Sequence, residues 1–365
     1  MDYLVCTAPA AQTGKIHGSI IMMKAMVMKK ITDLRVKREP LELLDLPVPE
    51  PAGSEVLLRV LTCGVCHTDI DEIEGRTPPL WFPMVPGHQV VGIVERMGPH
   101  ARQFKKGDRA GVAWINSACG SCHYCRDGEE NLCDRFVATG RDAHGGYAEY
   151  AVVPEKFAYP IPDLYSDAEA APLLCAGAIG YRSLRLTGMR DGDALGLVGF
   201  GASGHIVLKL VKYQFAGSKV YVFSRTEAER TFAKELGAAW AGNFGDPCPE
   251  KLRCAIDTTP AWGPVVSALR NLEKGGRLII NAIRKEESDK DDLLSLDYSS
   301  DLWLEKEIKS VANITRRDVG DFLRIAAHAG IRPEVQEYPL EEANRALLEL
   351  KERKIRGAKV LRISY

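Results

Sequence analysis

The sequence has no long apolar run, no excess of charge of one sign, no internal repeat and no low-complexity linker. A membrane-spanning helix needs about 20 consecutive, mostly apolar residues, and no segment approaches that length. The formal net charge of −1 gives neither the basic surface typical of nucleic-acid binding nor an acidic tail. We therefore expect no nucleic-acid partner and no insertion into a membrane.

The first residues also lack the features of a targeting segment. Residues 1–22 contain no basic region at the start, and the apolar stretch at 20–23 is too short for a signal peptide. We interpret residues 1–23 as an N-terminal extension, the alternative being a mis-called start with the true start at Met22, Met23 or Met26.

Cysteines, in contrast, are informative through their placement. Of the ten cysteines, four lie within residues 119–133. A disulfide framework would be unusual in a chain of 365 residues, which is large enough to bury its own core. The clustered spacing indicates metal binding, and we expect a reducing, cytoplasmic compartment.

The pattern of apolar runs and turn residues changes near residue 178. Before it, short β-type runs such as 55–60, 90–94 and 148–153 alternate with Gly and Pro, which predicts a compact, mostly antiparallel β domain. After it, apolar strands alternate with helices, which predicts a doubly wound parallel sheet and an α/β fold class. The last strand, 358–363, is expected to return to the first domain, so that the α/β domain is an insertion.

The strongest single motif is Cys119-x2-Cys122-x2-Cys125-x7-Cys133. Two-residue gaps let a turn of backbone direct successive sulfurs inward, and four thiolates suit a tetrahedral zinc. Because all four ligands come from the protein, the predicted site is structural. An iron–sulfur cluster has the same kind of ligands and stays an alternative.

A glycine-rich turn follows the first strand of the α/β domain. Gly199-Phe-Gly201-Ala-Ser-Gly204 lies between an apolar strand at 194–198 and a helical pattern. This is the context of a dinucleotide-binding turn, in which the glycines let the backbone approach the pyrophosphate at the helix N-terminus.

The end of the next strand indicates which coenzyme is used. An NAD enzyme usually has an acidic residue there to hold the ribose hydroxyls, but this chain has Ser224 and Arg225. A guanidinium can bind a 2′-phosphate. We therefore expect NADP(H) to be preferred over NAD(H), the alternative being a solvated Arg225 and use of both.

A second cysteine pair, Cys63-x-x-Cys66, is ambiguous alone. It could be half a zinc site, a redox dithiol or two core cysteines.

Taken together, the motifs resemble the zinc-containing alcohol dehydrogenases of the medium-chain dehydrogenase/reductase superfamily. The resemblance covers nearly everything from Lys24 to the C-terminus, and five motifs occur in the order of the family. They are Cys66-His67-Thr68-Asp69, Gly87-His88, the cysteine quartet, Ala171-Pro-Leu-Leu-Cys175-Ala-Gly177 and the glycine turn. The resemblance implies a GroES-like catalytic domain at 24–177 and 315–365, and a Rossmann-type coenzyme domain at 178–314.

In that family, the positions of Cys66, His88 and Cys175 bind the catalytic zinc, so the resemblance implies two zincs per chain. Zinc then lowers the pKa of an alcohol oxygen as a Lewis acid, and Thr68 takes the alcohol proton. Asp69 is expected to fix the tautomer of His88 through its free nitrogen. For Thr68 and Asp69 the alternative is a loop cap.

Three residues depart from the pattern of the family. Asp71 stands where a histidine of the family usually ends the proton relay. Because a carboxylate is a weaker base than an imidazole at neutral pH, we expect only a weak role for Asp71, and a relay through water or His67. Gln89 replaces a glutamate, and Ala358 replaces an arginine that contacts phosphate.

We therefore expect a zinc-dependent alcohol dehydrogenase or aldehyde reductase that acts on primary aliphatic or aromatic alcohols and forms a homodimer or homotetramer. Trp81, Phe82 and Trp114 fall where the family lines its substrate cleft, although core packing is the alternative for each. A polyol-type dehydrogenase is disfavoured, because such enzymes tend to have an acidic residue at the position of Cys175. The other alternative is a zinc- and nucleotide-binding protein without catalysis.

Overall fold

The chain folds into two compact units in the computed structural model, which describes residues 15–16, 19–354 and 356–363. Unit 1 comprises residues 1–175, 315–323 and 334–365, and unit 2 comprises 176–314 and 324–333. Most of the expected extension at 1–23 lies outside the described residues, but strand β3 already begins at Met22. Residues 324–333, which we had expected in the catalytic domain, group with unit 2.

Unit 1 is built around a seven-stranded sheet with the order β11-β7-β6-β5-β19-β18, in which β10 also pairs with β5. Apart from the parallel pair β18 and β19, its neighbours are antiparallel, as expected. The strands of this sheet are β5 (Glu55–Val65), β6 (Gln89–Met97), β7 (Arg109–Val112), β10 (Tyr150–Pro154), β11 (Ala158–Pro160), β18 (Val335–Pro339) and β19 (Ala358–Arg362). Smaller two-stranded pairs are β1 (Lys15–Ile16) with β2 (Ser19–Ile20), β3 (Met22–Met28) with β4 (Leu41–Pro47), and β8 (Ile115–Ser117) with β9 (Val137–Ala138).

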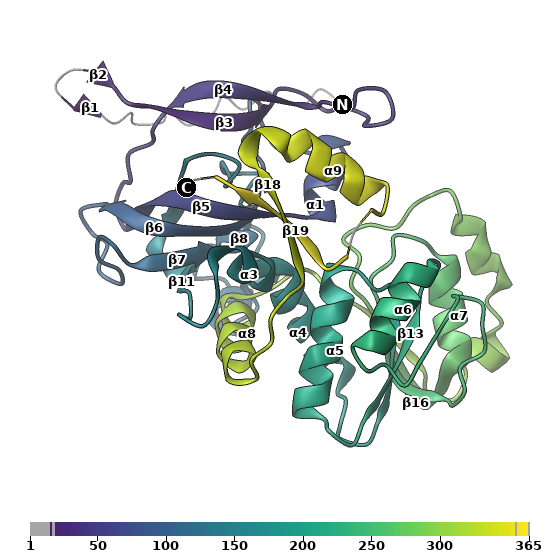
Figure 1. Cartoon of the computed structure of the whole chain (residues 1–365). Helices are drawn as coiled ribbons and strands as arrows, with labels where there is room; N and C mark the ends of the chain where they lie inside the picture. The colour runs from purple at the N-terminus through teal and green to yellow at the C-terminus, as the bar shows by residue number, and fades with distance from the viewer. Residues whose placement is uncertain (1–14, 17–18, 355, 364–365) are drawn as a thin grey trace. The chain divides into compact units, whose positions relative to one another are not determined.

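The closing strand of the chain lies in the middle of this sheet. In β19, Leu361 is opposite Cys63 of β5, which confirms that the last strand returns to the first domain. Helix α9 (Ala343–Lys351) packs against β18, β19 and α1 (His67–Ile73), as Figure 1 shows. The other helices of unit 1 are α2 (His123–Arg126) and α3 (Asp167–Pro172), and α8 (Arg316–His328) crosses the boundary between the units.

Unit 2 contains a six-stranded sheet with the order β14-β13-β12-β15-β16-β17, and all its neighbours are parallel. The first strands, β12 (Ala194–Val198) and β13 (Lys219–Phe223), match the apolar runs seen in the sequence. The other elements are α4 (Ala178–Thr187), α5 (Ala202–Gln214), α6 (Glu227–Glu235), β14 (Trp240–Gly242), β15 (Leu252–Asp257), α7 (Gly263–Asn271), β16 (Leu272–Ile280) and β17 (Glu307–Ser310).

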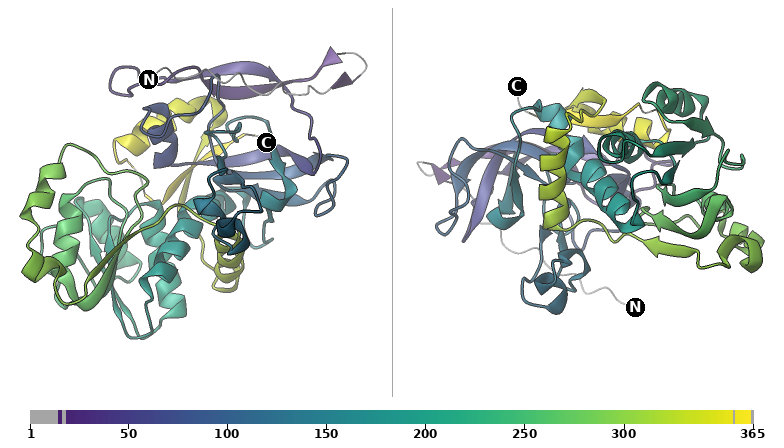
Figure 2. Two further views of the ribbon diagram at one scale, coloured as in Figure 1. Left: turned by 180° about the vertical axis from the view of Figure 1, so that it is seen from behind. Right: turned by 90° about the horizontal axis from the view of Figure 1, so that it is seen from below.

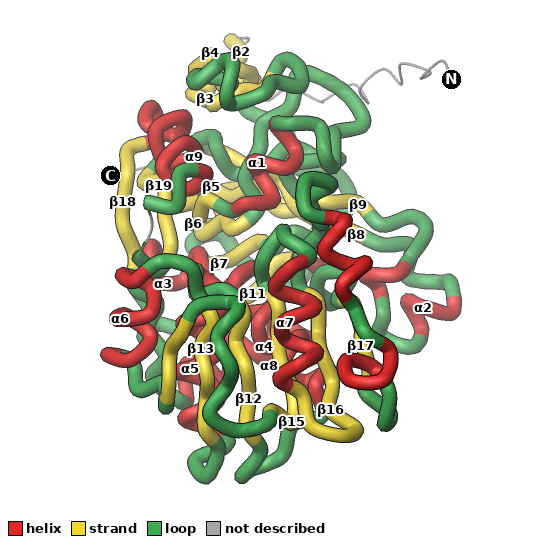
Figure 3. Tube along the Cα trace, turned by 90° about the vertical axis from the view of Figure 1, so that its right-hand side faces the viewer, coloured by secondary structure: helices red, strands yellow, loops and turns green. Residues whose placement is uncertain are grey.

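Helices cover both faces of this sheet. The chain order runs outward from β12 in both directions, and right-handed crossovers then place helices on opposite faces. Figure 3 shows α7 in front of β15 and β16, with α4 and α5 behind the strands. Helix α5 follows the glycine turn, where the sequence predicts a helix, and it buries an apolar stripe of four residues, namely Ile206, Val207, Leu210 and Val211. This arrangement positions the glycine turn at the carboxyl edge of the sheet, where ligands bind in such folds.

Candidate active site and metal centres

Three potential metal ligands converge in unit 1. Cys66 is the N-cap of α1 and directly follows β5, whereas His88 directly precedes β6. Since Gly64 of β5 is paired with Gln89 of β6, the two neighbouring strand ends hold these residues together. The π-helical segment Leu173–Gly177 supplies the third residue, Cys175. The ligand atoms of the three residues all lie within 4.8 Å of one another.

A buried carboxylate orients the imidazole of this group. Asp69 Oδ1 lies 3.1 Å from His88 Nδ1, and both side chains are fully buried. With Nδ1 engaged in this way, Nε2 faces the thiol of Cys175 at 3.3 Å. Burial alone would lower the pKa of His88, but the charge and hydrogen bond of Asp69 raise it well above its usual value. The expected contact between Asp69 and His88 is therefore present, and it leaves Nε2 directed toward Cys175.

The donor set suits zinc. Two sulfurs and one imidazole nitrogen are ligands that Zn²⁺ prefers, and three protein ligands leave one coordination position for water or substrate. A hydrogen bond from the Cys175 thiol holds the pKa of Cys66 well below its usual value, although burial opposes the shift. In contrast, burial raises the pKa of Cys63 well above the usual value, and Cys63 is not among the converging residues.

The carboxylate of Asp69 is held from two further directions. Its Oδ2 accepts hydrogen bonds from the Tyr147 hydroxyl at 3.0 Å and from the Cys66 backbone N–H at 2.8 Å. Tyr147 is 78 residues away in the sequence and is fully buried. Sequence reasoning did not identify this tyrosine, because nothing in the local pattern around it indicates a polar role.

The residues expected in the proton relay differ in their surroundings. Thr68 Oγ1 lies 3.6 Å from Cys66 Sγ, next to the converging ligands. Asp71 forms an ion pair with Arg76, whose guanidinium also contacts Glu74. Burial raises the pKa of Asp71, although Arg76 opposes the shift. His67, by comparison, is exposed.

Another buried carboxyl group, which the sequence did not indicate, lies on the same face of α1. Glu72 follows Asp69 by three residues, and its Oε1 accepts a hydrogen bond from Trp114 Nε1 at 3.1 Å. Burial and the nearby Asp69 raise the pKa of Glu72 well above its usual value. Trp114 is itself buried and packs on Phe136, so its indole forms part of the packed interior next to α1.

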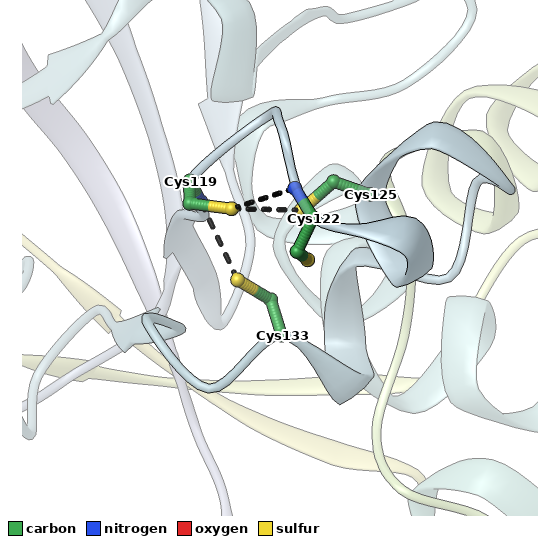
Figure 4. A group of neighbouring side chains, drawn as sticks. All are labelled: Cys119, Cys122, Cys125 and Cys133. Carbon is green, nitrogen blue, oxygen red and sulfur yellow. Dashed lines mark hydrogen bonds between the residues drawn. The ribbon is translucent and has the colours of Figure 1, made fainter.

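The four clustered cysteines form a second group in unit 1 (Figure 4). Two thiolates on one tetrahedral zinc lie about 3.8 Å apart when each bond is about 2.3 Å long, and Cys119 Sγ is 3.8 Å from Cys125 Sγ. The backbone N–H groups of Ser121 and Cys122 donate to Cys119 Sγ and lower its pKa to about 5. The right-hand view of Figure 2 shows the segment around α2 projecting from the rest of unit 1. The four sulfurs therefore suit a zinc ion that closes this projecting segment.

The glycine turn of unit 2 has open space where a phosphate could approach. Gly199 has φ +88°, and a Cβ there would lie 2.5 Å from Thr258 Oγ1. A Cβ on Gly201 would meet no atom within 4 Å, whereas one on Gly204 would lie 3.0 Å from the Gly199 carbonyl oxygen. The first glycine thus permits the turn, the second leaves room for a ligand and the third allows α5 to pack closely, as in dinucleotide sites.

The end of β13 carries charges of both signs. Ser224 is buried, and its hydroxyl donates a hydrogen bond to Glu229 on α6. Arg230 Nη1 donates to the carbonyl oxygens of Ser224 and Arg225. Arg225 is exposed, and its guanidinium lies 5.9 Å from the centre of the Phe244 ring. The sequence identified Ser224 and Arg225, but it did not indicate the carboxylate of Glu229.

Comparisons with known proteins show the family of the chain. Residues 52–163 match the alcohol dehydrogenase GroES-like domain. The protein named "Probable alcohol dehydrogenase AdhA" of Mycobacterium tuberculosis (strain CDC 1551 / Oshkosh) is 44% identical over 329 residues, which are 89% of this chain and 93% of that protein. The chain belongs to the zinc-type alcohol dehydrogenase family of the medium-chain dehydrogenase/reductase superfamily. It is therefore a nicotinamide-dependent alcohol or aldehyde oxidoreductase, of a family that uses zinc.

Two further members of the alcohol dehydrogenase group are similar to the chain. Cinnamyl alcohol dehydrogenase 7 of Arabidopsis thaliana is 35% identical over 240 residues, which are 62% of this chain and 67% of that protein. The crystal structure of an NAD-dependent alcohol dehydrogenase is 27% identical and covers 94% of this chain and 100% of its own, with a TM-score of 0.82. In the part of the chain that the structure describes, no helix is long and apolar enough to cross a membrane.

Proposed function

We propose that the protein is a zinc-dependent alcohol dehydrogenase or aldehyde reductase that interconverts primary alcohols and aldehydes, with unit 1 as the catalytic part and unit 2 as the coenzyme-binding part. The observation that carries this proposal is the group of Cys66, His88 and Cys175, in which Asp69 engages His88 Nδ1 and His88 Nε2 faces the Cys175 thiol. A structural zinc site would have four protein ligands, whereas three ligands are typical of a catalytic site.

Cys66, His88 and Cys175 are the proposed ligands of the catalytic zinc. When bound, zinc would supply a Lewis acid that lowers the pKa of an alcohol or polarises an aldehyde carbonyl, and a bound nicotinamide coenzyme would supply the hydride chemistry. We assign to Thr68 the transfer of the substrate proton, and the support is that its Oγ1 lies 3.6 Å from Cys66 Sγ. Because Asp71 is engaged by Arg76, we assign the outward path of the proton to His67 and solvent, with Asp71 in a minor role.

Cys119, Cys122, Cys125 and Cys133 are the proposed ligands of a second, structural zinc, which gives two zincs per chain. The convergence of the four sulfurs supports this assignment. The cysteines that the structure describes are all free, which also supports a reducing, cytoplasmic location.

The proposed coenzyme site comprises Gly199, Gly201 and Gly204 together with Ser224 and Arg225. We propose that NADP(H) is preferred over NAD(H). The support is the positive charge near the end of β13, where Arg225 is exposed and Arg230 binds the backbone of the same turn. A guanidinium is well suited to bind a 2′-phosphate.

For the substrate we propose a primary aliphatic or aromatic alcohol. Cys175 places a thiol, rather than a carboxylate, among the proposed zinc ligands. The similarity to a cinnamyl alcohol dehydrogenase supports the inclusion of aromatic alcohols. These features favour small apolar alcohols over polyols.

A panel of primary alcohols, aldehydes and polyols, assayed with both coenzymes, tests the proposal. We expect the highest kcat/KM for a primary alcohol or its aldehyde, with NADP(H) favoured by about threefold or more. A polyol as the best substrate would refute the substrate class. A tenfold preference for NADH would refute the proposed coenzyme preference.

We also propose that the chain forms a homodimer or homotetramer. Strand β17 is at the edge of the unit 2 sheet, and all four of its residues are exposed, including Ile308 at 44%. Proteins usually cover or charge such an edge, because its free backbone groups pair readily with another strand. Light scattering on the purified protein should give two or four times 40.2 kDa, and a monomer would contradict this proposal.

A further inference from the structure

A carboxylate from helix α6, that of Glu229, lies against Ser224 at the end of β13. A coenzyme whose pyrophosphate lies on the glycine turn has its adenosine ribose at the end of the neighbouring strand. Val198 and Phe223 are paired, and Gly199 N donates to the Phe223 carbonyl oxygen at 2.8 Å. Ser224 is therefore next to the glycine turn, and the Ser224 hydroxyl is bonded to Glu229. Glu229, which lies five positions after Ser224 in the sequence, therefore brings a negative charge to the expected ribose site.

Both partners of this hydrogen bond are held in place. Ser224 is 1% exposed, and its backbone N–H donates to the Gly242 carbonyl oxygen at 2.9 Å on the adjacent strand β14. Glu229 is the third residue of α6, and its own N–H donates to the N-cap Thr226 Oγ1 at 3.2 Å. A carboxylate at this position in a helix is also favoured by the helix dipole. Glu229 is thus oriented by the fold, and one carboxylate oxygen is used by Ser224.

The positive charges at the same turn are held differently. Arg230 donates to two backbone carbonyl oxygens, at 2.8 Å from Ser224 and 2.9 Å from Arg225, so its guanidinium is fixed under the turn. Arg225 is exposed and is the guanidinium free to meet an incoming phosphate. The turn therefore carries two groups of opposite charge, the oriented carboxylate of Glu229 and the exposed guanidinium of Arg225.

We propose that Glu229 is a specificity-determining residue that recognises the adenosine ribose of NAD(H) and limits the preference for NADP(H). The inference rests on the proposed coenzyme site. A ribose 2′-hydroxyl can donate a hydrogen bond to the second oxygen of Glu229, whereas a 2′-phosphate brings like charges together. Arg225 favours the phosphate and Glu229 opposes it, so the enzyme turns over with both coenzymes.

The test compares Glu229→Gln with Glu227→Gln in the full-length, zinc-loaded enzyme. Glu229→Gln keeps the shape and an oxygen acceptor for Ser224 but removes the charge. Glu227 is an exposed acid in the same first turn of α6, so its variant controls for a general loss of negative charge. The measurements are kcat/KM for NADPH and NADH with one aldehyde, and the Kd of each coenzyme from protein fluorescence.

We expect Glu229→Gln to raise the ratio of kcat/KM for NADPH over NADH by about tenfold, as expected for removal of one charge beside a phosphate dianion in a solvated site. The ratio should change less than about twofold in Glu227→Gln. A ratio that changes less than threefold in Glu229→Gln, or equally in both variants, would overturn the inference.

The coenzyme preference and the role of Glu229 are tested separately. The ratio measured for the unmodified enzyme tests the proposed NADP(H) preference, whereas the change in the ratio tests Glu229. If Glu229→Gln does not fold, Ser224→Ala replaces it, since this variant removes the hydroxyl that orients the carboxylate. It should lower kcat/KM for NADH more than for NADPH, and an equal effect on both would count against the inference.

Discussion

Asp69→Asn is the substitution that tests the metal centre most sharply, because the carboxylate has three donors around it. His88 Nδ1 faces Oδ1 at 3.1 Å, and the Tyr147 hydroxyl and the Cys66 N–H donate to Oδ2 at 3.0 and 2.8 Å. An amide has one oxygen and one NH₂ group, so it cannot accept from both sides. Either His88 Nδ1 or the Tyr147 hydroxyl and the Cys66 N–H must therefore face the NH₂ group of the asparagine, where the aspartate offers an accepting oxygen.

The two orientations of the asparagine have different costs. If its oxygen faces His88, its NH₂ group opposes the Cys66 N–H, although the Tyr147 hydroxyl can rotate and accept. An unsatisfied buried donor costs about 1–3 kcal/mol. If the amide is reversed, the NH₂ group favours a His88 tautomer that has its proton on Nε2, the atom proposed to bind zinc. Either outcome weakens the site, and loss of such a supporting residue typically reduces metal affinity by about 10–100-fold.

The assay is competition for zinc with a chromophoric chelator, combined with urea unfolding of the zinc-loaded protein. Asp69→Asn should lower the affinity of one zinc by at least about tenfold and reduce the free energy of unfolding by about 1–3 kcal/mol. Tyr147→Phe is the matched control: it removes one hydrogen bond from the same carboxylate, leaves His88 paired and should change zinc affinity less than about threefold. Zinc affinity in Asp69→Asn within threefold of the unmodified protein would refute the reasoning.

Three further outcomes follow from other parts of the chain. Cys119→Ser should reduce the zinc content by one per chain and lower Tm by about 5–10 °C, because the metal no longer cross-links the projecting segment. Zinc content is measured by atomic emission, and an unchanged value would refute the four-thiolate site. Gly199→Ala combines a φ of +88° with a Cβ 2.5 Å from Thr258 Oγ1, so it should cost about 1–3 kcal/mol and weaken coenzyme binding, which isothermal titration calorimetry measures. Burial lowers the pKa of His205 to about 4 from 6.5. The unfolded chain therefore takes up the proton first, and stability should fall by up to about 3 kcal/mol as the pH decreases from 6.5 to 4. In urea titrations, His205→Gln should flatten this slope, and an unchanged slope would exclude His205 as its source.

Regular elements and local motifs could be read from the sequence because their signals are local. The continuous apolar runs at Ala194–Val198 and Lys219–Phe223 became β12 and β13. The glycine turn and the cysteine quartet also depend on spacing within a few residues, and the structure brings their members together as expected. His88 and Cys175 are far from Cys66 in the sequence, and only the family resemblance indicated that they belong to the same site. In the structure, their ligand atoms converge with that of Cys66.

Side-chain partners over longer distances could not be predicted. Tyr147 reaches Asp69 from 78 residues away, and this contact exists only because the fold brings the two segments together. The pairing of Asp71 with Arg76 and of Ser224 with Glu229 spans only five residues in each case. Both pairs depend on side-chain directions at a helix end, which a pattern of residue types does not encode. The edge strand β17 was missed because all of its residues are exposed, so it lacks an apolar signal.

The central claim is that catalysis depends on a zinc held by Cys66, His88 and Cys175. Zinc content and alcohol oxidation, measured together on the unmodified protein and on His88→Ala, test this claim most directly. We expect two zincs per chain and turnover in the first protein, and one zinc, retained coenzyme binding and no turnover in the second. Full turnover in a His88→Ala protein with one zinc per chain would contradict the account.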